Sequence, residues 1–389
     1  MNGMTEGLRW SDLPAPTVQC HAANLMPLGD GTLGCVWFGG TQEGVADISI
    51  WFSKRAIGER GTDLGSGASA AWSSPVKLSS DATRSEQNPI LFPAPDGTLW
   101  LLHTAQHSGN QDTALVRCRV SNDHGATWGP TRELFTQAGI FVRQPVVVIS
   151  NGDWLVPIFH CRVNPGERWS GDHDTSAVMI SSDQGRTWTE HAVPDSIGCV
   201  HMNVLAARNG KSLVAFYRSR WADHVWRSTS SDGGRTWTAP QPTPLPNNNS
   251  SIQVTRTVSG RLAIVYNHIS AAQATERRVS LYDEIEDDAG STAAYAPSSP
   301  KGRTAFWGTP RAPMTIALSD DDGLTWPTKR DIETGDGYAM TNNSAEQRNR
   351  ELSYPSVAQT SDKTIHVAYT HHRQCIRHVA LTEDWIRQA

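Results

Sequence analysis

The chain has 389 residues and a formal net charge of −5, with 34 Lys and Arg against 39 Asp and Glu. This slightly acidic balance offers no basic surface for nucleic acid, and no apolar run approaches the roughly 18 residues of a membrane-spanning helix. Trp is abundant at 15 residues, against 7 Tyr and 8 Phe, which indicates that one aromatic position is used repeatedly. We therefore expect a monomer that binds neither nucleic acid nor membrane.

The first ten residues lack the basic and apolar segments of a signal peptide. Localisation stays open between an intracellular protein and one whose export signal is removed or unconventional. The cysteines show no Cys-x-x-Cys spacing and mostly lie in strand-like runs, which predicts buried free thiols. They are Cys20, Cys35, Cys118, Cys161, Cys199 and Cys375. The glycosylation sequons at Asn248, Asn249 and Asn342 do not indicate a compartment.

Pairs of strand-like segments joined by short turns recur along the whole chain. In chain order they are 18–28 with 32–38, 88–92 with 98–103, 142–150 with 154–159, 200–207 with 212–217, 251–258 with 261–266, and 353–359 with 364–369. Turn signals such as Asp96-Gly97 and Asn151-Gly152 separate the members of a pair. The pairs predict six antiparallel hairpins, which we name strands A and B of a repeated blade.

Four copies of the pattern Ser-x-Asp-x-Gly-x-Thr-Trp follow the second to the fifth pair, at 121–128, 181–188, 230–237 and 319–326. In each copy the Asp can accept turn amides, the Gly can adopt a backbone conformation that is costly for other residues, and the Trp can bury a large ring. We expect each copy to form the turn between strands C and D. Strand C is clear at 114–120 and 177–181, and 48–53 takes its place in the first blade, ahead of a decayed copy that ends near Pro75.

Repeated four-stranded blades close into one ring, so the pattern predicts an all-β fold with a single β-propeller over residues 1–389. The last blade, near Cys375–Leu381, is expected to borrow a strand from the N-terminus. Residues from about 270 to 312, rich in Ala, Ser and Pro, form a long insertion that could contain another element. Six blades can be counted, and seven are also compatible with the length.

The topology of a propeller indicates which face to search for chemistry. In a four-stranded antiparallel blade the A–B and C–D turns share one face, so the repeated pattern belongs there and is structural. The B–C loops and the segments that lead into each A strand share the opposite face. Arginines, histidines and amide residues are frequent in these segments, and Arg143, His201 and Tyr354 interrupt apolar strand beginnings near the axis. We expect a concave polar site on this face.

A site with many arginines and few free carboxylates suits a carboxylated sugar. Arg218, Arg220 and Arg143 could bind the carboxylate in bidentate fashion. Trp221 could stack on a sugar ring or pack in the core. The expected partner is an acidic oligosaccharide or polysaccharide.

The repeated pattern resembles the Asp box of sialidase-type β-propellers. That resemblance implies a Tyr nucleophile beside a Glu, an Asp acid/base and three arginines on the substrate carboxylate. Glu351 and Tyr354 lie where the nucleophile would be. The early Arg-Ile-Pro motif of sialidases is absent, and the nearest string, Arg143-Gln-Pro145, belongs to the third blade rather than the first.

Further strings resemble the sialidase-like propellers that include the L-rhamnose-α-1,4-D-glucuronate lyases (polysaccharide lyase family 42) and the related α-L-rhamnosidases. They include the runs at 20–24, 37–44, 84–89, 200–203, 216–223, 245–251 and 352–355. The resemblance implies seven blades. It also implies β-elimination at the rhamnose–glucuronate cap of arabinogalactan or gum arabic side chains. For the rhamnosidases, the resemblance implies an active site on the other face that uses a single His. His21 either matches that residue or is a strand histidine with its hydrogen bonds satisfied.

For a lyase, we expect Arg220 and Arg218 to neutralise the carboxylate, His201 or His103 to act as the base, and Tyr354 to donate a proton or stabilise charge. The sugar hydroxyls would be held by Arg143, Gln87, Asn88, Asn248 and Gln253. No cofactor is needed for this chemistry, although the polar channel admits a structural Ca²⁺. Asp172-His173-Asp174 and His371-His372 are weak metal-binding patterns. An exo-glycosidase and a non-catalytic glycan-binding propeller are the alternative functions.

Overall fold

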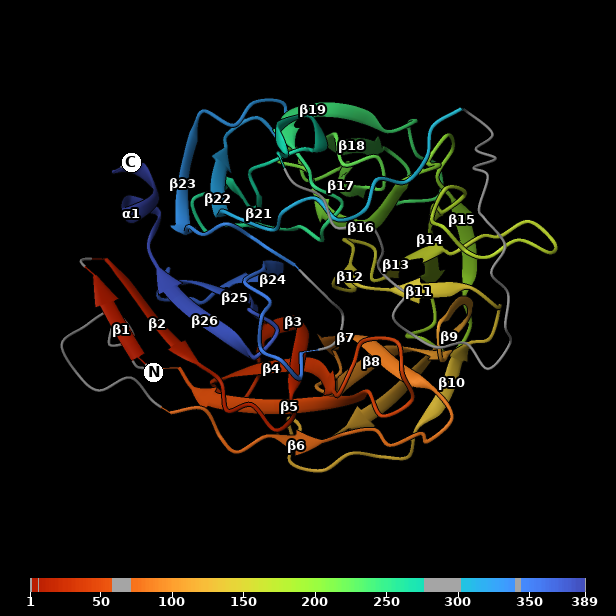
Figure 1. The fold of residues 1–389 in the computed structure, drawn as a ribbon. Helices are drawn as coiled ribbons and strands as arrows, with labels where there is room; N and C mark the ends of the chain where they lie inside the picture. The colour runs from red at the N-terminus through yellow and green to blue at the C-terminus, as the bar shows by residue number, and fades with distance from the viewer. Residues whose placement is uncertain (1, 6, 58–70, 276–301, 340–343, 389) are drawn as a thin grey trace.

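The computed structural model describes residues 2–5, 7–57, 71–275, 302–339 and 344–388. Within these residues six antiparallel sheets stand around a common axis as the blades of a β-propeller (Figure 1). The inner strands of neighbouring blades contact one another around the axis. The six hairpins predicted from the sequence are the A and B strands of these blades. A seventh blade, which the lyase resemblance implies, is not found in the part of the chain that the structure describes.

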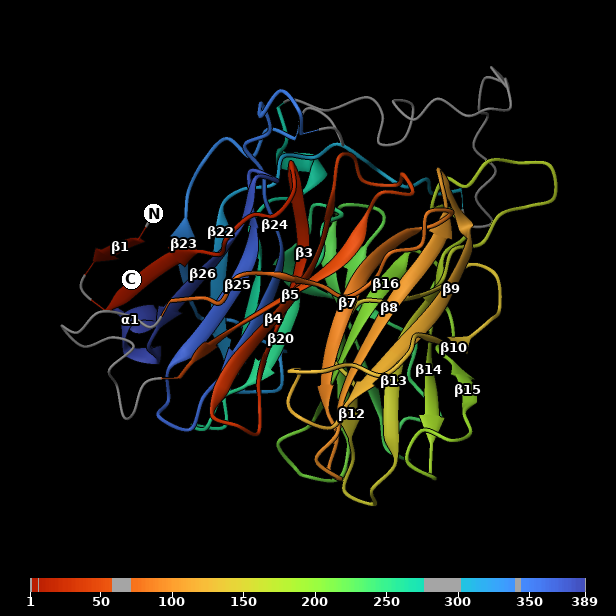
Figure 2. The ribbon, with the colours of Figure 1, turned by 90° about the horizontal axis from the view of Figure 1, so that it is seen from below.

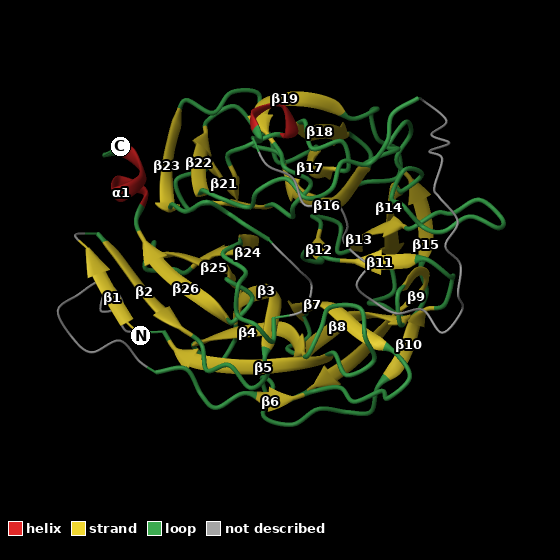
Figure 3. Cartoon of the chain, in the orientation of Figure 1, coloured by secondary structure: helices red, strands yellow, loops and turns green. Residues whose placement is uncertain are grey.

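In blades 1 to 5 the strands run outward from A to D in chain order, and almost all regular structure is strand (Figure 3). Blade 1 contains β3 (Gln19–Pro27), β4 (Thr32–Gly40), β5 (Ser49–Ala56) and β6 (Val76–Lys77). Blade 2 contains β7 (Ser85–Pro93), β8 (Leu99–His107), β9 (Asn110–Ser121) and β10 (Arg132–Phe135). Blade 3 contains β11 (Ile140–Val142) with β12 (Val147–Val148), then β13 (Trp154–His160), β14 (Thr175–Ser181) and β15 (Thr189–Ala192). Blade 4 contains β16 (Cys199–Ala206), β17 (Leu213–Ser219), β18 (His224–Ser230) and β19 (Gln241–Pro246). Blade 5 contains β20 (Gln253–Arg256), β21 (Leu262–Asn267), β22 (Met314–Ser319) and β23 (Thr328–Glu333).

The N-terminus closes the ring. Blade 6 contains β24 (Leu352–Gln359), β25 (Ile365–His371) and β26 (Cys375–Leu381), and its fourth strand is β2 (Leu8–Asp12), which pairs antiparallel with β26. The strand β1 (Asn2–Thr5) adds to the outside of β2, and the helix α1 (Glu383–Arg387) follows β26. The predicted loan of an N-terminal strand to the last blade is confirmed.

The interior lies between the blades rather than in one central mass. Between blades 2 and 3, for example, Trp100 of β8 meets Trp154 of β13 edge to face with ring centroids 5.6 Å apart. The six cysteines are all free, and five of them are buried, as predicted. No helix among the described residues is long and apolar enough to cross a membrane.

All four copies of the Asp box lie between strands C and D. In the first copy the hydroxyl of Ser121 donates to Asp123, and Asp123 accepts both the amide and the hydroxyl of Thr127 at 2.8 and 2.6 Å. Hydrogen bonds from Thr127 lower the pKa of Asp123 to about 2. The box Gly125 has φ +86°, and its lack of a side chain lets the turn approach Phe52 of the preceding blade. The box therefore both forms a turn and fits neighbouring blades together.

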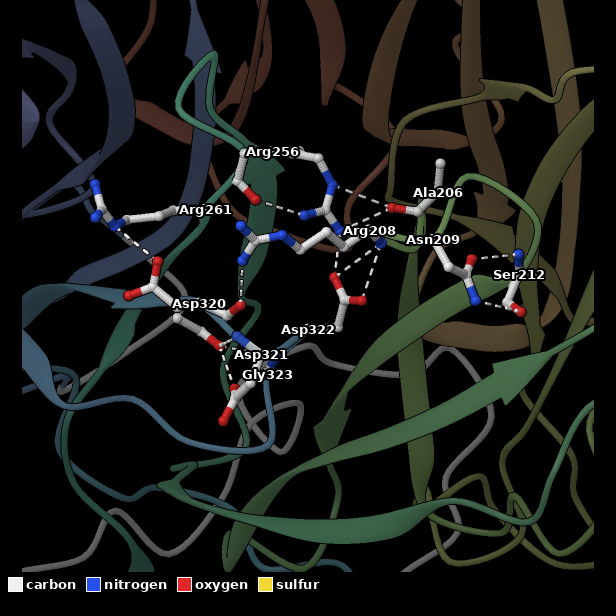
Figure 4. Close-up of polar contacts among 12 residues, drawn as sticks. Ala206, Arg208, Asn209, Ser212, Arg256, Arg261, Asp320, Asp321, Asp322 and Gly323 are labelled. Carbon is white, nitrogen blue, oxygen red and sulfur yellow. Dashed lines mark hydrogen bonds and ion pairs between the residues drawn. The ribbon is translucent and has the colours of Figure 1, made fainter.

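The fourth box has extra carboxylates that tie it to neighbouring A–B turns (Figure 4). Asp322 accepts the backbone N–H of Arg208, from the A–B turn of blade 4, at 2.9 Å and pairs with Arg256 of β20. Asp320 pairs with Arg261 of the next A–B turn at 2.9 Å. These contacts place the boxes and the A–B turns on one face of the ring, as the topology predicts. The B–C loops are left on the opposite face, along the upper edge in Figure 2.

Candidate functional site

A polar pocket lies close to the axis on the face opposite the boxes. Its lining side chains come from the beginnings of A strands, the ends of B strands and the B–C loops. The lining residues are Glu43, Gln87, Asn88, Gln111, Phe141, Phe159, His201, Arg218, Arg220, Trp307, Arg311 and Tyr354. Six of the predicted site residues are thus brought together: Gln87, Asn88, His201, Arg218, Arg220 and Tyr354. Their roles stay predictions.

Irregular inner strands aim these side chains at the axis. Asn88, His201 and Tyr354 each have a positive φ, between 49° and 53°, and each sits where the A–B pairing of its blade shifts register. Ala22 occupies the matching place in blade 1 with φ 58°. Such bulges are frequent beside active sites because they redirect a side chain that regular pleating would send elsewhere. The same device recurs at four of the six blades.

Arg218 is the central cation of the pocket. Only 1% of its surface is exposed, and among the described residues no carboxylate lies within ion-pair distance. Its Nε donates to the amide oxygen of Asn249 at 2.9 Å, and its Nη1 donates to the phenol oxygen of Tyr354 at 2.7 Å. Its Nη2 has no hydrogen-bond partner within the described chain. Burial lowers the pKa of Arg218 to about 10, so the group is still charged at neutral pH.

His201 is held as a neutral imidazole. Its Nε2 lies 3.4 Å from Nη1 of Arg218, and its Nδ1 lies 3.0 Å from the hydroxyl of Ser251. Because a guanidinium only donates, Nε2 must be the acceptor, and Nδ1 then carries the proton. Burial, followed by the charges of Arg218 and other arginines, holds the pKa of His201 well below its usual range. A basic nitrogen and a phenol hydroxyl are thus bridged by one guanidinium nitrogen.

Arg220 lines the same pocket, but its charge is already compensated. It pairs with Asp174, whose Oδ2 lies 2.7 Å from Nη2 and 2.9 Å from Nε. The guanidinium also lies among aromatic rings, 4.9 Å from Trp307 and 5.4 Å from Trp169. Burial is the largest single influence and opposes its charge, but the combined effect of Asp174 and the other surrounding groups raises the pKa of Arg220. The structure therefore favours Arg218 over Arg220 as the group that would meet a substrate carboxylate.

A network of buried ion pairs lies beside Tyr354 at the pocket. Glu351 pairs with Arg311 at 3.1 Å and with Arg373 at 3.0 Å, and Arg373 pairs with Glu43 at 2.7 Å. With Arg143, Arg218 and Arg220, the centre of the propeller holds five guanidinium groups against three carboxylates. An excess of two positive charges in a buried site strongly favours an anionic ligand.

The end of the insertion covers the pocket. The backbone N–H of Ala305 donates to Asp172 at 2.5 Å, and the N–H of Phe306 donates to the carbonyl of Arg220 at 2.8 Å. The indole of Trp307 donates to the carbonyl of Ser170 at 2.9 Å. This strap (residues 305–307) joins blade 3 to blade 4 above the arginines. Residues 276–301 of the predicted insertion lie outside the described residues.

The other five predicted site residues lie outside the lining of the pocket, for different reasons. His103 is fully buried and bonded to Glu86 at 3.1 Å, so it does not face the pocket where a base would act. Arg143 lies beneath Tyr354 and donates to its backbone carbonyl at 3.1 Å. Trp221 packs in the core, the second of the two interpretations offered by the sequence.

Two amides have structural partners. Asn248 donates to the carbonyl of Pro310 at 2.8 Å, and Gln253 accepts from the hydroxyl of Ser356 at 2.7 Å. His21 is also fully buried in its strand, with Nδ1 2.8 Å from the hydroxyl of Thr370. Its Nε2 has no hydrogen-bond partner among the described residues, so the predicted strand histidine is only half satisfied. Strand pattern alone could not tell these buried positions from pocket positions.

Sequence reasoning did not assign six of the lining residues, namely Glu43, Gln111, Phe141, Phe159, Trp307 and Arg311. Glu43 lies in the B–C loop of blade 1 and Gln111 near the start of β9. The sequence placed both in polar B–C segments, but nothing marked them out within those segments. Trp307 and Arg311 lie at the end of the insertion, where a Trp beside Pro and Arg residues in a small-residue segment was the available signal.

Metal binding receives no support from the patterns noted in the sequence. Among the described residues, no three His, Cys, Asp or Glu side chains gather closely enough to hold a metal ion. Asp174 is paired with Arg220, and Asp172 accepts from Ala305. A structural Ca²⁺ at the channel stays an untested prediction, and the cationic Arg143 in that channel does not favour it.

A family model of the BNR repeat-like domain matches residues 31–367, which is most of the chain. The chain belongs to the BNR repeat-like domain family. No curated protein matches it. Together, the four boxes, the six blades and this match identify a BNR repeat-like propeller.

Solved structures agree on the fold of this BNR repeat-like protein. The Hadza microbial sialidase Hz136 matches with a TM-score of 0.67 and 15% identity, over 95% of this chain and 66% of the sialidase. A protein of unknown function from Dyadobacter fermentans matches with a TM-score of 0.67 and 15% identity, over 97% and 100% of the two chains. The leech intramolecular trans-sialidase matches with a TM-score of 0.66 and 12% identity, over 99% and 72%. At these identities the likeness concerns the fold alone.

Proposed function

We propose that this BNR repeat-like protein cleaves rhamnose from glucuronate in arabinogalactan or gum arabic side chains by β-elimination. The observation that carries the proposal is Arg218, a buried guanidinium that, within the described part of the chain, has no carboxylate partner and no hydrogen bond at Nη2. A substrate carboxylate placed there would neutralise the excess positive charge of the pocket. The strings that resemble those of the rhamnose–glucuronate lyases support this choice of sugar.

The groups around Arg218 suit the two proton transfers of an elimination. The proton at C5 of a uronate becomes acidic when the adjoining carboxylate is neutralised. Nε2 of His201 would take that proton, the electron pair would form the C4–C5 double bond, and the C4–O bond to rhamnose would break. The phenol of Tyr354 would supply its proton to the leaving oxygen. The products are rhamnose and an unsaturated glucuronyl end.

Substrate binding would also prepare the base. The arginines around His201 help to hold its pKa well below the usual range, which makes the free imidazole a weak base. A bound carboxylate at Arg218 offsets part of that positive field and therefore raises the pKa of His201. His201 would then become an effective base only when the acidic sugar is bound.

The hollow at the centre of the pocket has a volume of about 20 Å³, which is room for about one water molecule. A sugar ring is much larger. Binding of a uronate would therefore require Trp307 and the strap that carries it to move outward. A covered pocket of this kind suits removal of a terminal cap more than cleavage within a long chain.

The experiment is incubation of the protein with gum arabic. We expect free rhamnose together with a co-product that absorbs ultraviolet light because its new double bond is conjugated with the carboxylate. Arg218→Gln should lower kcat/KM by at least about 10²-fold, the usual loss when a charge-stabilising donor is removed. The matched control is Arg186→Gln, an exposed arginine on the box face that should leave activity unchanged. Full activity of Arg218→Gln would refute the proposed role.

A hydrolase is the second candidate, and one observation favours it. Three arginines, Arg218, Arg220 and Arg311, line the pocket with Tyr354, the residue types that the sialidase resemblance implies. Rhamnose released without an absorbing co-product, or sialic acid released from a sialoside, would indicate hydrolysis. The absence of any product from these substrates would favour a glycan-binding propeller.

A further inference from the structure

A second and larger hollow lies on the same face as the pocket, between the loops of blades 2, 3 and 4. We call it the outer hollow. It is lined by Asp112, Ala138, Cys161, Arg162, Val163, Asn164, His173, Thr175 and Ile197, and its volume is about 530 Å³. This volume falls in the range of small-molecule binding sites. None of the residues predicted from the sequence as site residues lines it.

One layer of side chains separates the outer hollow from the pocket. Gln111 and Asp112 are consecutive residues of β9, so their side chains point in opposite directions, Gln111 into the pocket and Asp112 into the outer hollow. The Sγ of Cys161, another lining residue of the outer hollow, lies 3.5 Å from Oε1 of Gln111. A ligand that extends across Gln111 could therefore occupy both spaces at once.

The lining of the outer hollow is polar and carries a free cation. The backbone N–H of Arg162 donates to Asp174 at 3.2 Å, and its Nε donates to the hydroxyl of Thr175 at 3.0 Å. Its two terminal nitrogens have no partner among the described residues, although the side-chain stem is fixed by these bonds. Asp112 provides an acceptor on the other side.

The wall between the two spaces is chemically inert. Burial raises the pKa of the Cys161 thiol well above its usual range, and the charge of Asp174 acts in the same direction. The thiol therefore stays protonated and is a poor nucleophile. Among the described residues, the ionisable side chains that line the outer hollow are Arg162, Asp112 and His173. With one guanidinium and one carboxylate, the outer hollow favours a neutral ligand rich in hydroxyl groups, whereas the pocket favours an anion.

We propose that the outer hollow is a subsite for a neutral sugar joined to the acidic sugar in the pocket. This inference rests on the proposed function, because it takes the pocket to hold a uronate. Arg162 donates to hydroxyl oxygens of the neutral sugar, and Asp112 accepts from its hydroxyl groups. The substrate is then recognised as an acidic sugar and a neutral sugar together, with Gln111 beneath the linkage.

The test is calorimetric binding of two probes, glucuronic acid and rhamnosyl-glucuronic acid. All proteins carry His201→Gln so that the disaccharide is not consumed. We expect the disaccharide to bind about tenfold more tightly than glucuronic acid, as one or two added hydrogen bonds would give. Adding Arg162→Ala should remove that preference and leave the affinity for glucuronic acid unchanged.

The matched control is Arg168→Ala, which removes another exposed arginine of the same loop that does not line the outer hollow, and the preference should persist. The subsite proposal is overturned if the His201→Gln parent binds glucuronic acid and rhamnosyl-glucuronic acid equally well. It is also overturned if the preference for the disaccharide survives Arg162→Ala. Failure of both probes to bind the His201→Gln parent is a different result. It would mean that the pocket does not bind a uronate, and it would contradict the proposed function itself.

Discussion

Two arginines at the end of one strand illustrate what decides the role of a charged residue. Arg218 and Arg220 are both almost fully buried and both line the pocket. Asp174 lies against Arg220 and compensates its charge, whereas the partners of Arg218 among the described residues are all neutral. A compensated guanidinium holds the protein together, and an uncompensated one is free to bind an anion.

The Arg220–Asp174 pair leads to a prediction about stability. Asp174→Asn keeps the shape of the side chain and its bonds from Trp169 and Arg162, but it leaves a buried guanidinium without a counter-charge. We expect the free energy of unfolding to fall by about 3–5 kcal/mol, measured by urea denaturation. The double variant Asp174→Asn with Arg220→Gln should recover part of the loss. An unchanged urea midpoint in Asp174→Asn would show that the pair does not contribute.

At the scale of the element, the Asp box is a turn that also fits one blade against the next. Its hydrogen bonds are internal, from Ser to Asp and from Thr to Asp, so an isolated turn could form them. The box glycine differs, because it faces a side chain of the preceding blade: Gly234 faces Leu155, and Gly323 faces Phe216. The pattern thus combines a local requirement with a requirement of packing.

These two requirements can be separated with two glycines of almost equal φ. Gly323 has φ +84° and Gly260, in the A–B turn of the same blade, has φ +85°. An added Cβ at Gly323 would overlap the ring of Phe216, whereas nothing lies within 4 Å of one at Gly260. Gly260→Ala should cost about 1 kcal/mol of unfolding free energy through backbone strain. Gly323→Ala should cost about 1–3 kcal/mol more through overpacking.

Thermal or urea unfolding of both glycine variants measures the difference. If the two alanines destabilise the protein equally, the box glycine serves the turn alone, and the contact with the neighbouring blade contributes nothing.

At the scale of the molecule, ring closure buries polar groups where blades meet. Between blades 6 and 1, Nδ1 of His378 lies 3.3 Å from Nη1 of Arg55, and its Nε2 lies 3.0 Å from Nδ1 of His366. Because Arg55 only donates, Nδ1 of His378 accepts and Nε2 donates onward, so both imidazoles are neutral in the folded protein. Burial lowers the pKa of His366 to about 3 and holds that of His378 well below its usual range.

Buried neutral histidines make the folded protein sensitive to acid. The pKa of His21, His201, His366 and His378 is lowered on folding, so below about pH 6.5 the unfolded chain takes up protons that the folded chain does not. Stability is therefore lost as pH falls below that value, by up to about 1.4 kcal/mol per pH unit for each histidine. Urea unfolding between pH 7 and pH 5 should show a steep decline.

Two variants assign the source of that decline. His201→Gln should reduce the pH dependence of the unfolding free energy by the equivalent of about one proton taken up on unfolding. His107→Gln, at an exposed position, should leave that pH dependence unchanged. Stability that is flat from pH 7 to pH 5 would contradict the neutral state of the buried histidines.

The sequence by itself determined the architecture and the face of the site, because both follow from local, repeated patterns. Alternating apolar residues specify the hairpins, the box specifies the C–D turn, and alternation of turns around a four-stranded blade places the polar loops opposite. The same reasoning selected Arg143, His201 and Tyr354 as polar interruptions of inner strands, and Arg218 as an arginine of a B–C loop.

Only the tertiary structure decided which polar residue has which partner. Asp174 meets Arg220 from 46 positions away, and Arg311 and Trp307 reach the pocket from the end of an insertion. His103 is instead bonded to Glu86 inside its own blade. Charge compensation in a buried site depends on groups that are distant in the chain, so no local pattern could separate a free guanidinium from a paired one. The six A–B hairpins can be read along the chain, but the partner of each buried charge is decided only when the ring has closed.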